Sequence, residues 1–322
     1  MGNFNSVKAC CNGKFYAPQS EVLVESEKPV HQESGGVTYR NSEMQKDVSL
    51  VRDSLYDSVY KDLSFDTSRV QKLEKAVHYG KLLRLKVLSS STLEKGHIFT
   101  INPLGHDASS REKKDGFVYF GCKKRSREET GEKGEIVNDI VIPSLDKVLA
   151  EKHRGQHFCI SYDLYGDCYF IKDLAIGFGT FVKILTPLLL KDNFLIHMGD
   201  NFILVNIVSP VSPENTMPRL RLKLFGAPCT GDVFYFNASD YQKSTIHIGR
   251  VPKCEIQIED SLISKVQATL YFSELGWVLV DGEYEANRSS TNGTWLYLNE
   301  SYEMYNDMVF KSNHTLFQVS IV

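Results

Sequence analysis

Two copies of one pattern of short alternating segments fill most of this 322-residue chain and limit what it can fold into. Apolar and polar residues alternate within each segment, as in strands that bury one face. Residues 83–88 (LRLKVL) are echoed by 220–225 (LRLKLF). Further pairs follow in the same order: 96–102 with 231–237, 139–142 with 255–258, 169–173 with 277–281, and 179–184 with 293–298. A repeat of many short strands predicts a mainly β fold with two antiparallel β-sandwich domains in tandem.

The two copies also indicate domain boundaries. Each copy ends in a further alternating strand, at residues 202–207 and 316–321. We therefore predict one sandwich over 81–208 and a second over 219–322. A stiff, proline-rich linker at 209–218 joins them.

The part of the chain before the repeat has a different composition. Residues 1–47 are polar and rich in Ser, Glu and Gly, which predicts a flexible tail. Apolar residues at helical spacing then predict one or two short helices within 48–80, the second capped by Asp66 or Thr67 and ended by Gly80. We expect these helices to dock on the first sandwich, and a coiled-coil or partner-binding segment is the alternative.

The N-terminus carries a pattern for lipid attachment. Gly2 after Met1, with Ser6 in the favoured position, fits the myristoylation motif, and Cys10 and Cys11 follow closely. One myristoyl chain binds membranes with a constant of only about 10⁴ M⁻¹, so that stable anchoring needs a second signal such as palmitoylated cysteines. We expect the protein at the cytoplasmic face of a membrane, or in the cytoplasm if the motif is accidental.

Composition argues against several classes of function. The 40 acidic and 37 basic residues nearly balance, so we expect no nucleic-acid partner. Seven cysteines without a C-x-x-C pair indicate a reducing compartment and no zinc site. No phosphate-binding glycine loop, G-x-S-x-G or H-E-x-x-H motif occurs. We therefore expect no enzyme, no catalytic residue, no cofactor, no metal ion and no small-molecule substrate.

Two further clusters have ordinary explanations. His153 and His157 stand four residues apart, but the equivalent segment of the second copy is a strand edge, so the pair should not share a helical face. The basic run at 123–127 lies among glutamates, which favours a solvated loop over a nuclear address.

Polar residues of the second copy that do not fit strand positions collect in three loops. The first contains Gly249 and Arg250, the second Ser264 and Lys265, and the third the sequence STNGT at 290–294. One arginine, one lysine, several hydroxyls and an amide are suited to binding an anion. No acid, base or nucleophile pair accompanies them.

The order Gly-Arg, Ser-Lys-x-x and Ser-Thr-Asn-Gly-Thr-Trp resembles the forkhead-associated (FHA) domain, a β-sandwich that binds phosphothreonine peptides. The resemblance implies that Arg250, Ser264 and Lys265 bind the phosphate. It also implies that Thr291 helps to close the site and that Asn292 aligns the peptide backbone.

The resemblance further assigns structural roles within these loops. Gly249 and Gly293 shape the turns. Gln267 stands where the family has a histidine that braces the binding loops, and a glutamine offers different hydrogen-bond geometry. We expect the loops either to be held less firmly or to be braced in another way.

The first copy keeps the strands and glycines but not the binding residues. Cys122 replaces Arg250, Arg154 replaces Ser264, and Phe178 replaces Asn292, whereas His157 matches the bracing histidine. We expect a degenerate FHA-like domain that is structural or binds a partner that is not phosphorylated.

These features together predict a membrane-anchored, non-catalytic adaptor that binds threonine-phosphorylated proteins through the domain at 219–322. The main alternative is a constitutive scaffold whose two sandwiches bind partners regardless of phosphorylation. A nuclear reader of DNA-damage signals is a third class, which requires the N-terminal lipid motif to be accidental.

Overall fold

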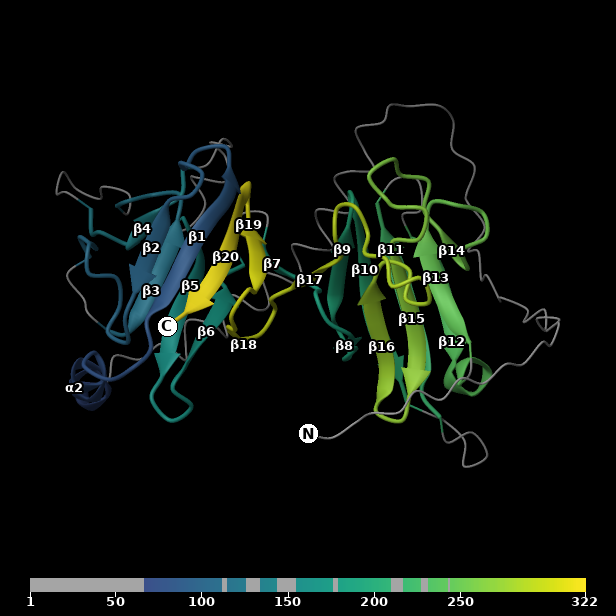
Figure 1. Ribbon diagram of the computed structural model, residues 1–322, viewed down its shortest axis with the longest axis horizontal. Helices are drawn as coiled ribbons and strands as arrows, with labels where there is room; N and C mark the ends of the chain where they lie inside the picture. Colours follow the sequence, from purple (N-terminus) through teal and green to yellow (C-terminus); the bar gives the residue numbers. More distant parts are fainter. Residues whose placement is uncertain are drawn as a thin grey trace, which may run out of the picture.

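The computed structural model describes residues 67–111, 115–125, 134–143, 155–175, 179–209, 217–226, 231–242 and 244–322. The fold is mainly β, as predicted, and Figure 1 shows two sandwiches side by side. The first sandwich consists of β1 (Leu83–Ser90), β2 (Ile98–Ile101), β3 (Phe117–Gly121), β4 (Ile140–Val141), β5 (Gln156–Asp163), β6 (Cys168–Asp173), β7 (Thr180–Lys183), β18 (Tyr302–Glu303), β19 (Val309–Ser312) and β20 (Thr315–Ile321). The second consists of β8 (Leu188–Leu189), β9 (Leu195–Met198), β10 (Asn201–Val208), β11 (Arg219–Phe225), β12 (Val233–Asn237), β13 (Thr245–Gly249), β14 (Ile256–Gln257), β15 (Ala268–Ser273), β16 (Gly276–Asp281) and β17 (Trp295–Tyr297), with a 3₁₀ turn η1 (Ala238–Tyr241).

The same strand order recurs in both sandwiches. In the first, β2-β1-β20-β19-β7 form one side and β4-β3-β5-β6-β18 the other. In the second, β12-β11-β10-β9-β17 face β14-β13-β15-β16-β8. Strands that occupy the same place in the two sandwiches come from equivalent positions of the sequence repeat. The repeat is therefore present in the structure as well as in the sequence.

The last three strands of each copy are exchanged between the two sandwiches. Strands β8, β9 and β10 follow β7 in the chain but pair within the second sandwich. Strands β18, β19 and β20 follow β17 and pair within the first, so that β20 lies beside β1 in Figure 1. The folded units therefore do not coincide with the predicted ranges 81–208 and 219–322, and those boundaries are corrected. Equivalent strands share length and alternation, so the sequence pattern does not say which copy supplies each one.

One strand pair joins the two sandwiches into a continuous ten-stranded sheet. β7 and β17 pair antiparallel, with Lys183 opposite Trp295, Val182 opposite Leu296 and Phe181 opposite Tyr297. These strands are equivalent in the repeat, so an approximate twofold axis passes between Val182 and Leu296. The edge of each sandwich is thereby covered by the other, which leaves neither strand exposed for pairing with another chain.

The exchanged strands contribute to both cores. In the first sandwich, Phe310 and Phe317 on β19 and β20 pack against Phe158 on β5, with ring centroids 5.6 and 6.3 Å away. In the second, Ile196 and Ile203 belong to the same buried apolar cluster as the residues of β11, β13 and β15. Complete burial of such a side chain contributes about 1.5–3 kcal/mol. The exchanged strands therefore form part of both hydrophobic cores and do not merely contact the surface of the other sandwich.

Helix α2 (Thr67–Ala76) confirms the second predicted helix and its docking on the first sandwich. Leu73 and Ala76 are fully buried. Arg69 stacks 4.7 Å from the centroid of the Phe117 ring and donates hydrogen bonds to the carbonyl oxygens of Asp115 and Tyr162. In the part of the chain that the structure describes, no helix is both long and apolar enough to cross a bilayer.

Other predictions concern residues that the structure does not describe. The tail at 1–47, with Gly2, Cys10 and Cys11, and the first predicted helix lie outside the described residues, as does linker segment 210–216.

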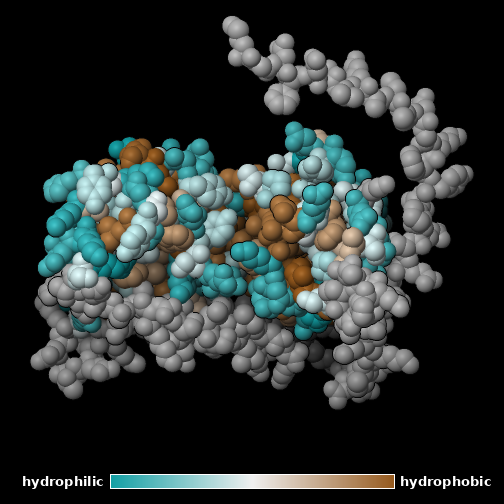
Figure 2. All heavy atoms as spheres, turned by 90° about the horizontal axis from the view of Figure 1, so that it is seen from below, coloured by the Kyte–Doolittle hydropathy of each residue, from teal (hydrophilic) through white to brown (hydrophobic). Residues whose placement is uncertain are grey.

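On the face in Figure 2, hydrophilic side chains cover most of the described surface, with smaller hydrophobic patches between them. This distribution is typical of sheets that bury one face and leave the other to water.

Candidate phosphopeptide-binding site

Three loops meet at one end of the second sandwich. They are residues 250–255 after β13, 258–267 before β15 and 282–294 between β16 and β17, and we refer to them as the site loops. The amide of Arg250 donates to the carbonyl of Ser264 at 3.1 Å, and the amide of Thr291 donates to Ser264 Oγ at 2.9 Å. Ser264 therefore links all three site loops.

Gly249 allows the first two site loops to approach closely. A Cβ atom at this position would lie 2.2 Å from the carbonyl oxygen of Lys265. Any other residue would push the backbone of one loop away, since real Cβ contacts are essentially never that short. The glycine before Arg250 is thus required by packing between two loops, and its expected role in shaping a turn stays a prediction.

The predicted phosphate-binding side chains are accessible. Arg250, Lys265, Thr291 and Asn292 are exposed, and Ser264 is half-buried. Among the described residues, neither the Arg250 guanidinium nor the Lys265 ammonium forms an ion pair. The end of the sandwich therefore presents two cationic side chains beside two hydroxyl groups.

Gln267 braces the site loops from below. Its side chain is completely buried, and its Oε1 accepts a hydrogen bond from the Ser264 amide at 2.9 Å. Its Nε2 donates to Ser290 Oγ, the Gly293 carbonyl and Thr294 Oγ1 at 3.0, 3.0 and 3.2 Å. Of the two outcomes expected for a glutamine here, the structure has the second: the loops are braced in another way.

The third site loop has its own support. Ser290 Oγ donates to Asp281 Oδ1 at 2.6 Å and accepts from the amide of Gly293 at 2.9 Å. Gly293 has φ +77°, a left-handed conformation that favours glycine. Sequence reasoning missed Asp281. Because it ends β16 and the loop that follows contains Ser290, a hydrogen bond between the two side chains could have been predicted.

The Asn292 side chain is anchored to the neighbouring loop. Its Nδ2 donates to the Leu262 carbonyl at 2.8 Å, and the backbone carbonyl of Asn292 accepts from Trp295 Nε1 at 3.1 Å. The Leu262 amide in turn donates to Asp260 Oδ1 at 2.8 Å. The amide that the resemblance assigns to peptide alignment is thus already oriented.

The exchanged hairpin of β9 and β10 supports the second site loop by binding Asp260. Asp260 Oδ2 accepts hydrogen bonds from Asn201 Nδ2 at 2.8 Å and from the Asp200 amide at 3.1 Å. Asn201 is buried and belongs to the first copy. Sequence reasoning could not find this support, because it placed residues 188–208 in the other domain.

The matching end of the first sandwich differs in chemistry. Cys122 occupies the place of Arg250, and burial raises the pKa of its thiol, which keeps it neutral. His157, in the place of Gln267, is buried and accepts a hydrogen bond from Asn313 Nδ2 at 2.7 Å. Arg154 and Phe178 lie outside the described residues.

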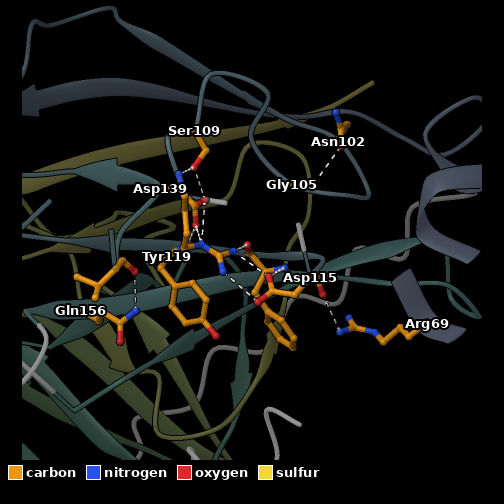
Figure 3. A network of polar contacts seen from close by, with 11 residues as sticks. Arg69, Asn102, Gly105, Ser109, Asp115, Tyr119, Asp139 and Gln156 are labelled. Carbon is orange, nitrogen blue, oxygen red and sulfur yellow. Dashed lines mark hydrogen bonds and ion pairs between the residues drawn. The ribbon is translucent and has the colours of Figure 1, made fainter. Parts of the chain in front are cut away.

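A well-buried charged cluster of the first sandwich, shown in Figure 3, satisfies its charges internally. Arg111 donates to both oxygens of Asp139 and both of Asp115, and also to the Phe117 carbonyl. Burial acts to lower the pKa of Arg111, but these carboxylates outweigh it and raise that pKa. All three nitrogens of the guanidinium are engaged within the protein, so this cluster holds a loop in place and presents no free charge to a ligand. No group of three or more His, Cys, Asp or Glu among the described residues is placed to hold a metal ion.

Comparison with known proteins agrees with the geometry of the second copy. No curated protein matches the chain. The family model of the FHA domain matches residues 246–311, which contain all three site loops. The matched range follows chain order, so it also includes β18 and part of β19, which lie in the first sandwich. The chain thus contains an FHA domain at 246–311, a protein-interaction module that recognises phosphothreonine.

Proposed function

We propose that this protein is a non-catalytic adaptor that binds threonine-phosphorylated proteins at the site loops. The observation that carries the proposal is the pair of exposed cations, Arg250 and Lys265, on loops held in place by the buried Gln267. A site assembled in advance loses little conformational entropy when it binds.

The side chains fit the chemistry of a phosphate dianion. A phosphothreonine carries a charge of about −1.5 to −2 and three acceptor oxygens. Arg250 offers a planar fork of donors, and Lys265 a compact charge. The hydroxyls of Ser264 and Thr291, 3.3 Å apart, supply further donors. Asn292, at the rim, is placed to meet the peptide backbone.

We further propose that the first sandwich is a degenerate FHA-like domain. The repeated strand order and the place of His157 support the relationship. Cys122 in the place of Arg250 supports the loss of phosphate binding. Because its strands β8, β9 and β10 complete the second sandwich, the first copy has a structural role whether or not it binds a partner.

We propose, finally, that the N-terminus anchors the adaptor to the cytoplasmic face of a membrane. The support is the motif at Gly2 and Ser6 together with Cys10 and Cys11. Myristate alone binds reversibly, and a palmitoylated cysteine supplies the second signal that stable anchoring needs.

The experiment that tests the adaptor function separates it from a constitutive scaffold. Partners captured from a lysate by the full chain are treated with a protein phosphatase and washed, and untreated captures serve as the control. We expect phosphatase treatment to release the partners, and capture by Arg250→Ala to fail. Retention of the same partners after dephosphorylation favours the scaffold.

A further inference from the structure

Lys183 lies against the third site loop of the second sandwich, although it belongs to the first copy. It ends β7, directly opposite Trp295 on β17. A Cβ atom built on Gly293 would lie 2.7 Å from Lys183 Cε and 3.5 Å from its Cδ. The far end of the lysine therefore crosses the backbone of Gly293, next to Asn292.

The approximate twofold axis provides an internal comparison. Tyr297 is the equivalent of Lys183, and Gly179 is the equivalent of Gly293. The Tyr297 ring lies 3.0 Å from a Cβ built on Gly179, and its hydroxyl donates to Asp173 Oδ1 at 2.8 Å. In each sandwich, the glycine just before the paired strand is therefore covered by a side chain from the other copy.

The two covering side chains differ in what they do with their polar ends. The Tyr297 hydroxyl donates to the buried carboxylate of Asp173 and is thereby engaged within the protein. The Lys183 ammonium has neither a hydrogen bond nor an ion pair with any residue that the structure describes. Packing over a glycine does not need a charge, so the charge of Lys183 is available for a ligand.

The surroundings of Lys183 strengthen its positive potential. The ten strands of the sheet that contains β7 and β17 include no Asp or Glu. Lys311 lies on the same sheet, with its Nζ 4.5 Å from the centroid of the Trp295 ring. A bound peptide that follows Asn292 toward Trp295 therefore meets positive charge and no acidic strand residue.

We propose that Lys183 determines specificity at the phosphopeptide site by binding an acidic side chain close to the phosphothreonine. The inference rests on the proposed function of the site loops. It gives the first copy a direct part in recognition, since the residue reaches the site only because β7 pairs with β17. A half-exposed ion pair of this kind changes affinity by about two- to five-fold.

The test uses the full chain and synthetic phosphothreonine peptides with degenerate flanks. At each of the four positions after the phosphothreonine, a set with glutamate is compared with a set with glutamine. Lys183→Met keeps the stem that packs over Gly293 and removes the charge, and Lys183→Glu reverses it. Lys86→Met, an exposed lysine on β1 of the same sheet, is the matched control, and thermal melts confirm folding.

We expect the wild type to prefer glutamate at one of these positions by about two- to five-fold. Lys183→Met should abolish that preference, Lys183→Glu should invert it, and Lys86→Met should keep it. If Lys183→Met retains the preference, or the wild type shows none while Arg250→Ala still abolishes phosphate-dependent binding, the role of Lys183 is rejected and the proposed function stands. Absence of phosphate-dependent binding by the wild type rejects both.

Discussion

Gln267 braces the site loops through hydrogen bonds of its side-chain amide, at the position where the FHA resemblance predicts a histidine ring. The Nε2 group of Gln267 donates to three acceptors and its Oε1 accepts one hydrogen bond, and every partner of its side chain belongs to a site loop. Bracing therefore depends on a buried polar side chain of suitable reach and not on an imidazole ring. This residue joins the second and third site loops through one buried point.

Gln267→Ala should destabilise the protein and loosen the site. The change leaves the Ser264 amide and the Gly293 carbonyl without their partner, and an unsatisfied buried polar group costs about 1–3 kcal/mol. Urea unfolding should show that loss, and phosphopeptide affinity should fall with it. Gln242→Ala, at an exposed position of the same sandwich, is the control. Unchanged stability of Gln267→Ala would show that the loops do not depend on this brace.

At the scale of elements, the sequence predicted which segments are strands but not where the last three of each copy go. Alternation identified 202–207 and 316–321 as strands, and both are present. Their exchange depends on contacts such as Asn201 with Asp260 and Asn313 with His157, which join the two copies. Lys183, Asn201 and Asp260 escaped the site prediction for the same reason. Motif residues within one copy, such as Arg250 and Asn292, were found because their spacing is local.

The exchange predicts that residues 219–322 do not fold as a monomeric sandwich with the native core. This fragment lacks β8, β9 and β10, which supply buried residues including Ile196, Met198 and Ile203. Circular dichroism and light scattering should show an unfolded chain or an oligomer, and the chain 67–322 is the control. A monomer with cooperative unfolding would mean that β18, β19 and β20 can return to their own copy.

Strands β9 and β19 also meet across the junction through two titratable residues. Lys311 Nζ lies 3.0 Å from His197 Nδ1 and over the rings of Phe181 and Trp295. Burial and the charge of Lys311 lower the pKa of His197 from 6.5 to about 3. Burial also lowers the pKa of Lys311 from 10.5 to about 8. The histidine is therefore neutral in the folded protein at neutral pH, and the lysine is charged.

The pH dependence of stability should report this neutral histidine. Between pH 6.5 and about 3, the unfolded chain binds a proton that the folded protein does not, so the free energy of unfolding falls as pH falls. The slope from His197 approaches about 1.4 kcal/mol per pH unit. Denaturant titrations from pH 7 to 4 should show a shallower slope for His197→Gln than for His314→Gln, an exposed control. Equal slopes would contradict a His197 that stays neutral in the folded protein.

At the scale of the whole molecule, the two sandwiches are joined by one sheet, and the site loops of the FHA domain lie at one end of the second sandwich. The ten-stranded sheet and the exchanged strands tie the copies together, so that each copy completes the sandwich of the other. In the adaptor that we propose, the lipid-attachment motif at Gly2 determines where the protein resides. In that proposal, recognition and location depend on separate parts of the chain.

Gly2→Ala should move the protein from the membrane fraction to the soluble fraction, because no myristoyl chain can then be attached. Cys10→Ser combined with Cys11→Ser should leave weak, reversible binding through myristate alone. Fractionation of cells that express each variant measures both effects, and Asn3→Ala, which keeps the motif, is the control. A Gly2→Ala protein that still sediments with membranes contradicts the anchoring proposal.

The most direct test of the account is calorimetric titration of the full chain with a phosphothreonine peptide selected from a library. Hydrogen bonds to charged groups contribute about 1.5–3 kcal/mol each, so Arg250→Ala should lower affinity by about ten- to a hundred-fold without unfolding the protein. Lys265→Ala should cost less, because solvent screens its charge, and Asn292→Ala should weaken phosphorylated and unphosphorylated peptides alike. Equal affinities of the wild type and Arg250→Ala would contradict phosphate recognition at this site.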